Sequence, residues 1–170
     1  GDPLIFGRAG EEMLALEQAQ IDYEVVPGVT AASACAAEAK IPLTMGEDMR
    51  ALVYLTGHST NGLTPYDWAG FTSKGVMLVL YMGVKMAPKI QANLLTVGAC
   101  KNSKITIIEN GCHETARTVE TTLGKLSQDM RRHEVRNPAI ILISIDRSPV
   151  VLDQPEDKTE RSLQSKALMN

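Results

Sequence analysis

Residues 139–145 read Ala-Ile-Ile-Leu-Ile-Ser-Ile, an almost unbroken apolar run that follows Asn137-Pro138. A short apolar run rich in β-branched residues is typical of a strand that is covered on both faces of a sheet. The stretch Val76–Tyr81 has the same character. Because such runs alternate with helical segments, the sequence predicts an α/β fold whose sheet is at least partly parallel.

Further strands and helices are predicted around these two runs. Pro88 near a first turn and Gly98 as a C-terminal stop indicate one helix. A second helix is marked by the apolar residues Leu123, Leu126 and Met130. The complete set of strands predicted in this part of the chain is Leu52–Thr56, Val76–Tyr81, Ile105–Glu109, Arg117–Thr122 and Ala139–Ile145.

The front of the chain has a different pattern. Residues 6–20 predict a short amphipathic helix with acidic residues near its start, where the helix dipole favours them. Residues Ile21–Val26 predict a strand that Pro27-Gly28 ends. Thr30 is a good N-cap for a helix of small side chains over residues 31–37, and such a helix lets a neighbouring backbone or ligand approach closely.

The composition is that of a globular protein. The chain has 170 residues, of which 44% are hydrophobic and 22% charged. Lys and Arg total 17 against 20 for Asp and Glu, and only 4% of residues are aromatic, so a nucleic acid is not expected as a partner. No apolar run approaches the roughly 20 residues of a membrane helix, and no charged-then-apolar leader opens the chain. We therefore expect a soluble, cytoplasmic protein with no membrane partner.

The thiols and imidazoles show no metal-binding pattern. Cys35, Cys100 and Cys112 are widely spaced and form no CxxC pair, so we expect reduced, buried thiols. No histidine shares a metal-ligand spacing with them, and no metal is assigned. His58 follows a predicted strand and is a candidate donor to a ligand, whereas surface positions are expected for His113 and His133.

Glycines stand at the ends of four predicted strands, at Gly28, Gly57, Gly83 and Gly111. Either they simply terminate strands, or together they form a rim on which the main chain contacts a ligand, since ligands of open α/β sheets collect beyond the carboxyl ends of the strands. Thr30 is likewise either a plain N-cap or, with its free amides, a place for an anion. The chain lacks both GxxxxGK[ST] and GxGxxG, which disfavours a nucleoside triphosphate and an NAD-type cofactor.

Several segments occur in one characteristic order. They are Gly-Asp-Pro-Leu-Ile-Phe-Gly-Arg at 1–8, Glu-Val-Val-Pro-Gly-Val-Thr-Ala-Ala at 24–32, Thr-Gly-His at 56–58, Tyr-Met-Gly at 81–83 and Glu-Asn-Gly at 109–111. In this order, and up to about Arg147, the chain resembles the S-adenosylmethionine-dependent tetrapyrrole methyltransferases, and among them the branch that acts on uroporphyrinogen III and also occurs as the methylating domain of sirohaem synthase. Cys112 stands where that family commonly has Thr.

The resemblance implies a domain plan. In it, residues 1–49 are the remainder of an N-terminal α/β subdomain, and residues 50–147 are a complete C-terminal α/β subdomain with a mixed sheet. The residues at 46–50 themselves indicate a linker. Residues 148–170 are a polar tail, expected to be disordered or loosely docked. The family's front part, which would precede Gly1 and carry the catalytic proton-transfer residues, is not within this sequence. The family is usually homodimeric.

The resemblance also implies a reaction and a site. The methyl donor is S-adenosylmethionine, which leaves as S-adenosylhomocysteine. The acceptor is uroporphyrinogen III, methylated on carbons 2 and 7 to give precorrin-2. The alternatives are a methyltransferase for a later precorrin and a non-catalytic subdomain that serves dimerisation or ligand binding. The cofactor contacts implied by the resemblance fall on Gly1, Asp2, Ile5, Thr30, Ala31, Met82 and Gly111.

A tetrapyrrole with many carboxylates requires local cations on an acidic protein. By position in the sequence, the candidates for binding the substrate are Arg8, Lys85 and Arg117. Each has an alternative interpretation as ordinary solvated surface charge.

Overall fold

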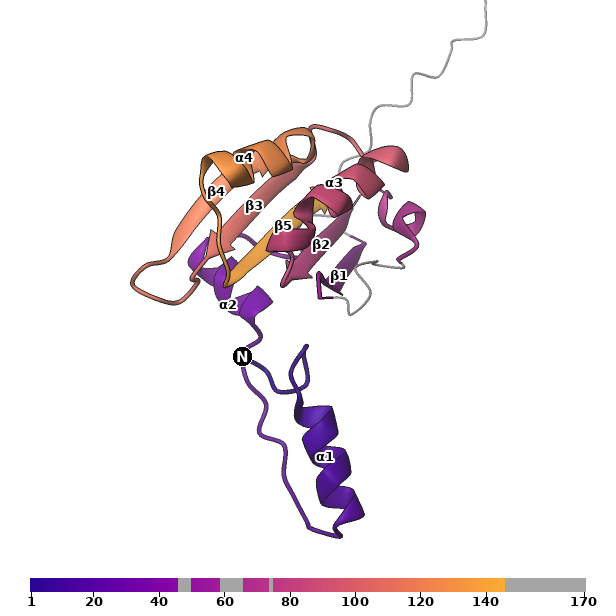
Figure 1. Cartoon of the computed structure of the whole chain (residues 1–170), viewed down its shortest axis with the longest axis vertical. Helices are drawn as coiled ribbons and strands as arrows, with labels where there is room; N and C mark the ends of the chain where they lie inside the picture. Colours follow the sequence, from indigo (N-terminus) through magenta and orange to yellow (C-terminus); the bar gives the residue numbers. More distant parts are fainter. Residues whose placement is uncertain (46–49, 59–65, 74, 146–170) are drawn as a thin grey trace, which may run out of the picture.

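The computed structural model describes residues 1–45, 50–58, 66–73 and 75–145 (Figure 1). The predicted polar tail at 148–170 and most of the predicted linker at 46–50 lie outside these ranges. The structure therefore bears on residues 1–45 and on the sheet-forming part up to residue 145, and not on the predicted boundary between them or on the tail.

A five-stranded mixed sheet forms the centre of the structure. Its order is β1-β2-β5-β3-β4. β1 is parallel to β2, while β5 is antiparallel to both β2 and β3, and β4 is antiparallel to β3. The predicted α/β class and the mixed sheet are confirmed, and each predicted strand of the sheet agrees with an observed one to within a residue. The bounds are β1 Ala51–Thr56, β2 Val76–Tyr81, β3 Lys104–Glu109, β4 Arg117–Thr122 and β5 Ala139–Ile145.

Helices cover both faces of this sheet. In Figure 1, α3 (Ala87–Thr96) and α4 (Leu126–Arg132) lie over one face and α2 (Ala31–Glu38) lies on the other. Within the described residues, short 3-10 helices at Trp68–Phe71, Val84–Met86 and Leu123–Lys125 connect the elements. No helix in the described ranges has the length and apolar character needed to span a membrane.

The central strands are apolar throughout because both of their faces are covered. All six residues of β2 are buried. Leu78 and Leu80 pack into the core beneath α3 and α4, whereas the intervening Met77 and Val79 pack into the core beside α2. Successive side chains of β2 point to opposite faces of the sheet, so the strand contributes to both cores. β4, at the edge, instead alternates buried Val119 with exposed polar residues.

The predicted helix signals between β2 and β3 are confirmed. Pro88 occupies the first turn of α3, where its missing N–H costs no hydrogen bond. Gly98 follows the helix with a φ of +89°, a conformation that favours glycine and that ends the helix.

The predicted strand at Ile21–Val26 is wrong. These residues form an irregular segment that runs beside α1 (Ala9–Gln18), away from the sheet (Figure 1). A strand requires a neighbour that takes its backbone hydrogen bonds, and none of the described strands lies next to this segment. α1 is shorter than the predicted 6–20 and buries none of its residues, while Val26 is 74% exposed.

Two adjacent leucines on α3 test this account of the core. Leu94 is fully buried, whereas Leu95 is 37% exposed. We expect Leu94→Ala to lower the free energy of unfolding by about 2–5 kcal/mol, because it leaves a cavity under the sheet. The matched control Leu95→Ala should cost about 0.5–1 kcal/mol. Urea unfolding followed by circular dichroism measures both, and equal losses would contradict the layer arrangement.

Candidate functional site

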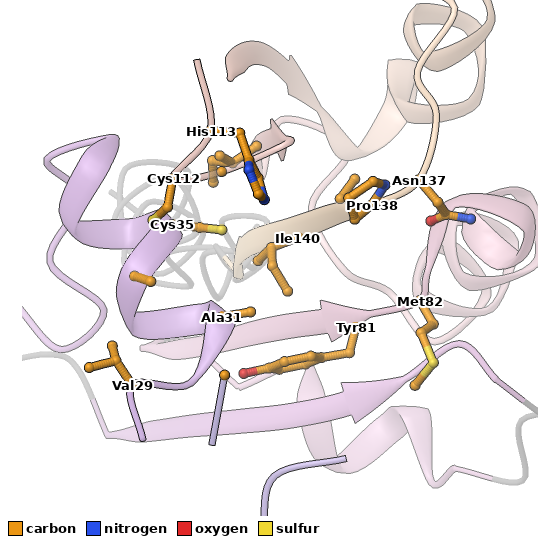
Figure 2. Close-up of a pocket in the computed structure, with 15 residues that line it drawn as sticks. Val29, Ala31, Cys35, Tyr81, Met82, Cys112, His113, Asn137, Pro138 and Ile140 are labelled. Atoms are coloured by element: carbon orange, nitrogen blue, oxygen red, sulfur yellow. The ribbon is translucent and has the colours of Figure 1, made fainter. Parts of the chain in front are cut away.

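A pocket of about 690 Å³ lies where the strand ends converge. β1, β2 and β3 run in the same direction, so their carboxyl ends share one edge of the sheet, and antiparallel β5 begins at that edge. Figure 2 shows the pocket between this edge and α2. It is lined by Gly1, Val29, Ala31, Ala34, Cys35, Tyr81, Met82, Ile108, Gly111, Cys112, His113, Asn137, Pro138, Ala139 and Ile140.

The small side chains of α2 let the helix approach the end of β3. Ala31, Ala34 and Cys35 form this wall of the pocket. A Cβ placed on Gly111 would overlap the Sγ atom of Cys35. A side chain at position 111 would therefore displace the Cys35 thiol, and the expectation that this helix admits a close neighbour is confirmed.

Tyr81 ties the start of α2 to the sheet. Its hydroxyl pairs with Oγ1 of Thr30 and accepts a hydrogen bond from the backbone N–H of Ala32 at 3.1 Å. Its ring packs against that of Phe6, with centroids 4.8 Å apart. Thr30 occupies the N-cap position, as predicted, but its side chain makes no capping hydrogen bond because its hydroxyl is turned to Tyr81.

The main chain at the strand ends adopts an uncommon conformation. Met82 after β2, and Asn110 and Cys112 after β3, have φ values of 53°, 51° and 65°. Left-handed backbone is unfavourable for residues other than glycine and persists where the surroundings hold it. At Cys112 the surroundings include Oε2 of Glu38, which accepts a hydrogen bond from the Cys112 N–H at 2.6 Å.

A buried carboxylate holds the opposite wall. Glu109 ends β3 with its side chain only 8% exposed, and its Oε2 accepts a hydrogen bond from Nε of Arg117 at 2.9 Å and forms an ion pair with Nη2 of the same residue at 2.7 Å. Its Oε1 accepts from the backbone N–H of Arg136 at 3.1 Å. The Asn110 N–H, one residue on, donates to the carbonyl of Pro138 at 2.9 Å. Together these bonds fix the turn after β3 against the segment that leads into β5.

The residues predicted to contact a cofactor come together, although not all of them line the pocket. Gly1, Ala31, Met82 and Gly111 line it. The others lie behind the lining: Thr30 contacts Tyr81, Ile5 packs against the core beside α2, and the Asp2 carboxylate accepts hydrogen bonds from the N–H groups of Leu4 at 2.8 Å and Gly28 at 3.2 Å.

The predicted cations lie outside the lining. Arg8 is 83% exposed and pairs with Glu11 at 2.8 Å. Lys85 lies in the 3-10 helix after Gly83. Arg117 is held by Glu109 and also donates to the carbonyl of His133 at 2.8 Å.

The sequence did not reveal several lining residues. His113 is exposed, as expected, and it also borders the pocket, which the sequence did not predict. His58, the candidate donor, does not line the pocket. Asn137 and Pro138 reach the pocket because β5 is antiparallel to its neighbours. The direction of β5 cannot be predicted from the local sequence pattern. Of the three free cysteines only Cys35 is buried as expected, while Cys100 is half-buried and Cys112 exposed. Within the described ranges no three His, Cys, Asp or Glu side chains are grouped so that they could hold a metal ion.

The chain matches the family model of the tetrapyrrole (corrin/porphyrin) methylases over residues 1–127. It is 41% identical over 143 residues to the siroheme synthase of Hydrogenovibrio crunogenus and 40% identical over the same length to that of Pseudoalteromonas translucida. Both alignments cover 84% of this chain but only 30% of the relative. The chain thus spans less than a third of the length of these relatives.

Solved structures agree with these matches. The uroporphyrin-III C-methyltransferase of Thermus thermophilus, complexed with S-adenosyl homocysteine, superposes with a TM-score of 0.72 at 31% identity, covering 85% of this chain and 60% of that one. A cobalt precorrin-4 methyltransferase superposes with a TM-score of 0.76 at 24% identity, covering 85% of this chain and 61% of that one. At this identity the match shows a shared fold only.

Substitution of Glu109 tests whether its hydrogen bonds stabilise the turn after β3. We expect Glu109→Gln to lower the free energy of unfolding by about 1–3 kcal/mol, because charged hydrogen bonds are lost in a buried position. Glu120→Gln is the matched control: Glu120 pairs with Lys104 at 3.3 Å at the far end of the same two strands, and both side chains are more than 60% exposed. Its loss should be about 0.5 kcal/mol.

Urea unfolding of both variants, with amide exchange to locate the change, makes the measurement. In Glu109→Gln, exchange should accelerate at Asn110 and Arg136, whose N–H groups belong to the network. An unchanged exchange rate at these two amides would contradict the role given to Glu109.

Proposed function

The chain belongs to the tetrapyrrole methylase family, and on that premise we propose that its pocket binds S-adenosylmethionine and that it takes part in the methylation of uroporphyrinogen III on carbons 2 and 7, which yields precorrin-2. One observation carries the proposal. Gly1, Ala31, Met82 and Gly111 are far apart in the sequence, yet they line one pocket at the carboxyl edge of the sheet. Open α/β sheets bind their ligands at this edge.

The pocket fits an adenosyl-sized ligand. Its volume of about 690 Å³ lies within the range of about 300–1,000 Å³ that is usual for small-molecule sites. Its floor is apolar, with Ile108 and Ile140, and its α2 wall has only small side chains. At Gly111 a side chain would close the space between the wall and the turn after β3.

The chain's own residues contribute position rather than a reacting group. A bound S-adenosylmethionine supplies an electrophilic methyl group, which an electron-rich pyrrole carbon accepts. Alanine and glycine at the wall hold the donor close to main chain, and the apolar floor excludes water from it. The left-handed backbone at Met82 and Cys112 fixes the contour of the rim. We assign no proton-transfer residue to this chain.

The acceptor requires cations, and we propose Arg8, Lys85 and Arg117 for this role. Arg8 is well exposed, and its ion pair is with Glu11, whose side chain is 73% exposed, so a carboxylate of the acceptor can compete for Arg8. Arg117 is 47% exposed but is already engaged by Glu109. Of the two arginines, Arg8 is therefore the one whose charge is more available for exchange.

We propose that residues 1–49 belong to a first α/β subdomain and that the active assembly is a homodimer. The exposed apolar side chains of the front segment support the first part, because a face of this kind is normally covered in the working protein. They include Leu4, Phe6, Leu14, Ile21, Val26 and Val29.

Uroporphyrinogen III is favoured over a later precorrin as the acceptor. The relatives near 40% identity carry the name siroheme synthase, and the solved structure at 31% identity is a uroporphyrin-III C-methyltransferase. The precorrin-4 enzyme, at 24% identity, supports the fold but not the choice of substrate.

Calorimetric titration of S-adenosylhomocysteine into the folded chain tests the pocket. We expect saturable binding that Met82→Ala weakens at least about fivefold, roughly 1 kcal/mol, because apolar contact at the rim is lost. Met45→Ala is the matched control, since Met45 is 70% exposed and does not line the pocket. Absence of binding to a chain that circular dichroism shows to be folded would overturn the assignment of the pocket for this chain.

The acceptor is tested separately with uroporphyrin III, the stable oxidised form of the proposed substrate, followed by its fluorescence. We expect Arg8→Ala to weaken its binding about threefold to tenfold and to reduce the dependence of binding on salt. Lys104→Ala removes another exposed, paired cation, at the end of β3 that lies away from the pocket, and should leave binding unchanged. Equal effects of the two variants would mean that the attraction is general rather than local.

A further inference from the structure

Two of the three cysteines, Cys35 and Cys112, line the same pocket. Cys35 and Glu38 lie one turn apart on α2, and both contact the turn that follows β3. Glu38 accepts the hydrogen bond from the Cys112 N–H, and the Cys35 thiol lies directly against the backbone of Gly111. Figure 2 shows the Cys35 and Cys112 side chains at the same end of the pocket, one from the helix and one from the turn.

The two thiols differ in accessibility. Cys112 is exposed, while Cys35 is only 5% exposed. Burial raises the pKa of the Cys35 thiol, and the nearby Cys112 and Glu38 raise it further. Cys35 therefore remains a neutral thiol near pH 7, and a reagent in solution meets Cys112 first.

The proposed methyl transfer makes no use of either thiol. The methyl transfer needs the volume of the pocket to hold the donor, whereas the two thiols are nucleophilic groups on the wall of the pocket. Two thiols that line a cavity of this size give the pocket a possible chemistry that the methyl transfer does not use.

We propose that Cys112 and Cys35 form a dithiol site that reacts with small organic disulfides such as oxidised glutathione. The Cys112 thiolate attacks one sulfur of the disulfide, a mixed disulfide forms, and one thiolate of the reagent leaves. Cys35 then loses its proton to solvent and attacks the Cys112 sulfur, and the second thiolate leaves. The two protein thiols are oxidised to one Cys35–Cys112 disulfide, and the reagent is reduced to two thiols.

This step alters the pocket directly. The mixed disulfide places the reagent's half inside the cavity, and the internal disulfide joins α2 to the turn after β3. Both products occupy or narrow the wall that contains Gly111. The modified chain is accordingly expected to lose its capacity for an adenosyl-sized ligand.

The test uses Cys100→Ser as the parent, because Cys100 is half-buried and precedes β3 at the opposite edge of the sheet. The folded parent is incubated with excess oxidised glutathione, quenched with acid and weighed by mass spectrometry. We expect it to lose the mass of two hydrogen atoms and to give a peptide pair joined between Cys35 and Cys112. No methyl donor or acceptor is present, so the result does not depend on the proposed function.

Two further variants separate the steps. With Cys35→Ala added, the reaction should stop at one glutathione on Cys112, and alanine is chosen because Cys35 lies among the alanines of α2. With Cys112→Ser added instead, the chain should remain unmodified because Cys35 is buried. The proposal is overturned if the parent keeps both thiols free, if the Cys35→Ala chain takes up no glutathione, or if Cys35 alone is modified as quickly as the pair.

Discussion

The insertion of β5 between β2 and β3, antiparallel to both, is the constraint on which the rest of the structure depends. β2 and β3 run the same way but are not neighbours, so their ends are separated by the width of one strand. The start of β5 fills that interval with Asn137 and Pro138. A pocket that reaches from Met82 to Gly111 is the direct result, and Ile140, near the start of the inserted strand, forms part of its floor.

Two different kinds of bond close the pocket from either side. On one side the Tyr81 hydroxyl meets the start of α2, so the helix is positioned by a strand residue. On the other side Glu109 joins β4, β3 and the segment before β5 through charged hydrogen bonds. Glu109 carries the greater share of the positioning, because a buried carboxylate without its partners is far costlier than a hydroxyl without one.

The sequence predicted what local patterns determine. The sheet class was predicted from the apolar runs of β2 and β5, because a strand buried on both faces has apolar residues throughout. Helix α3 was predicted from Pro88 and Gly98, because the backbone conformation at its two ends favours these residue types. The strand expected at Ile21–Val26 fails for the opposite reason, since a strand exists only with a partner. The roles of His113 and Pro138 depend on strand order, and the Glu109 network depends on three segments meeting, so neither has a local signature.

The left-handed residues at the rim have a consequence for how such a pocket changes over time. At Met82, Asn110 and Cys112 the shape of the rim is determined by the backbone angle φ rather than by the volume of the side chains. Glycine and asparagine adopt this backbone readily, whereas valine and isoleucine resist it. Descendants of this chain can exchange the side chains that touch a ligand while the contour persists, provided that they avoid branching at Cβ. The backbone shape of the rim can thus be conserved while the side chains that contact the ligand change.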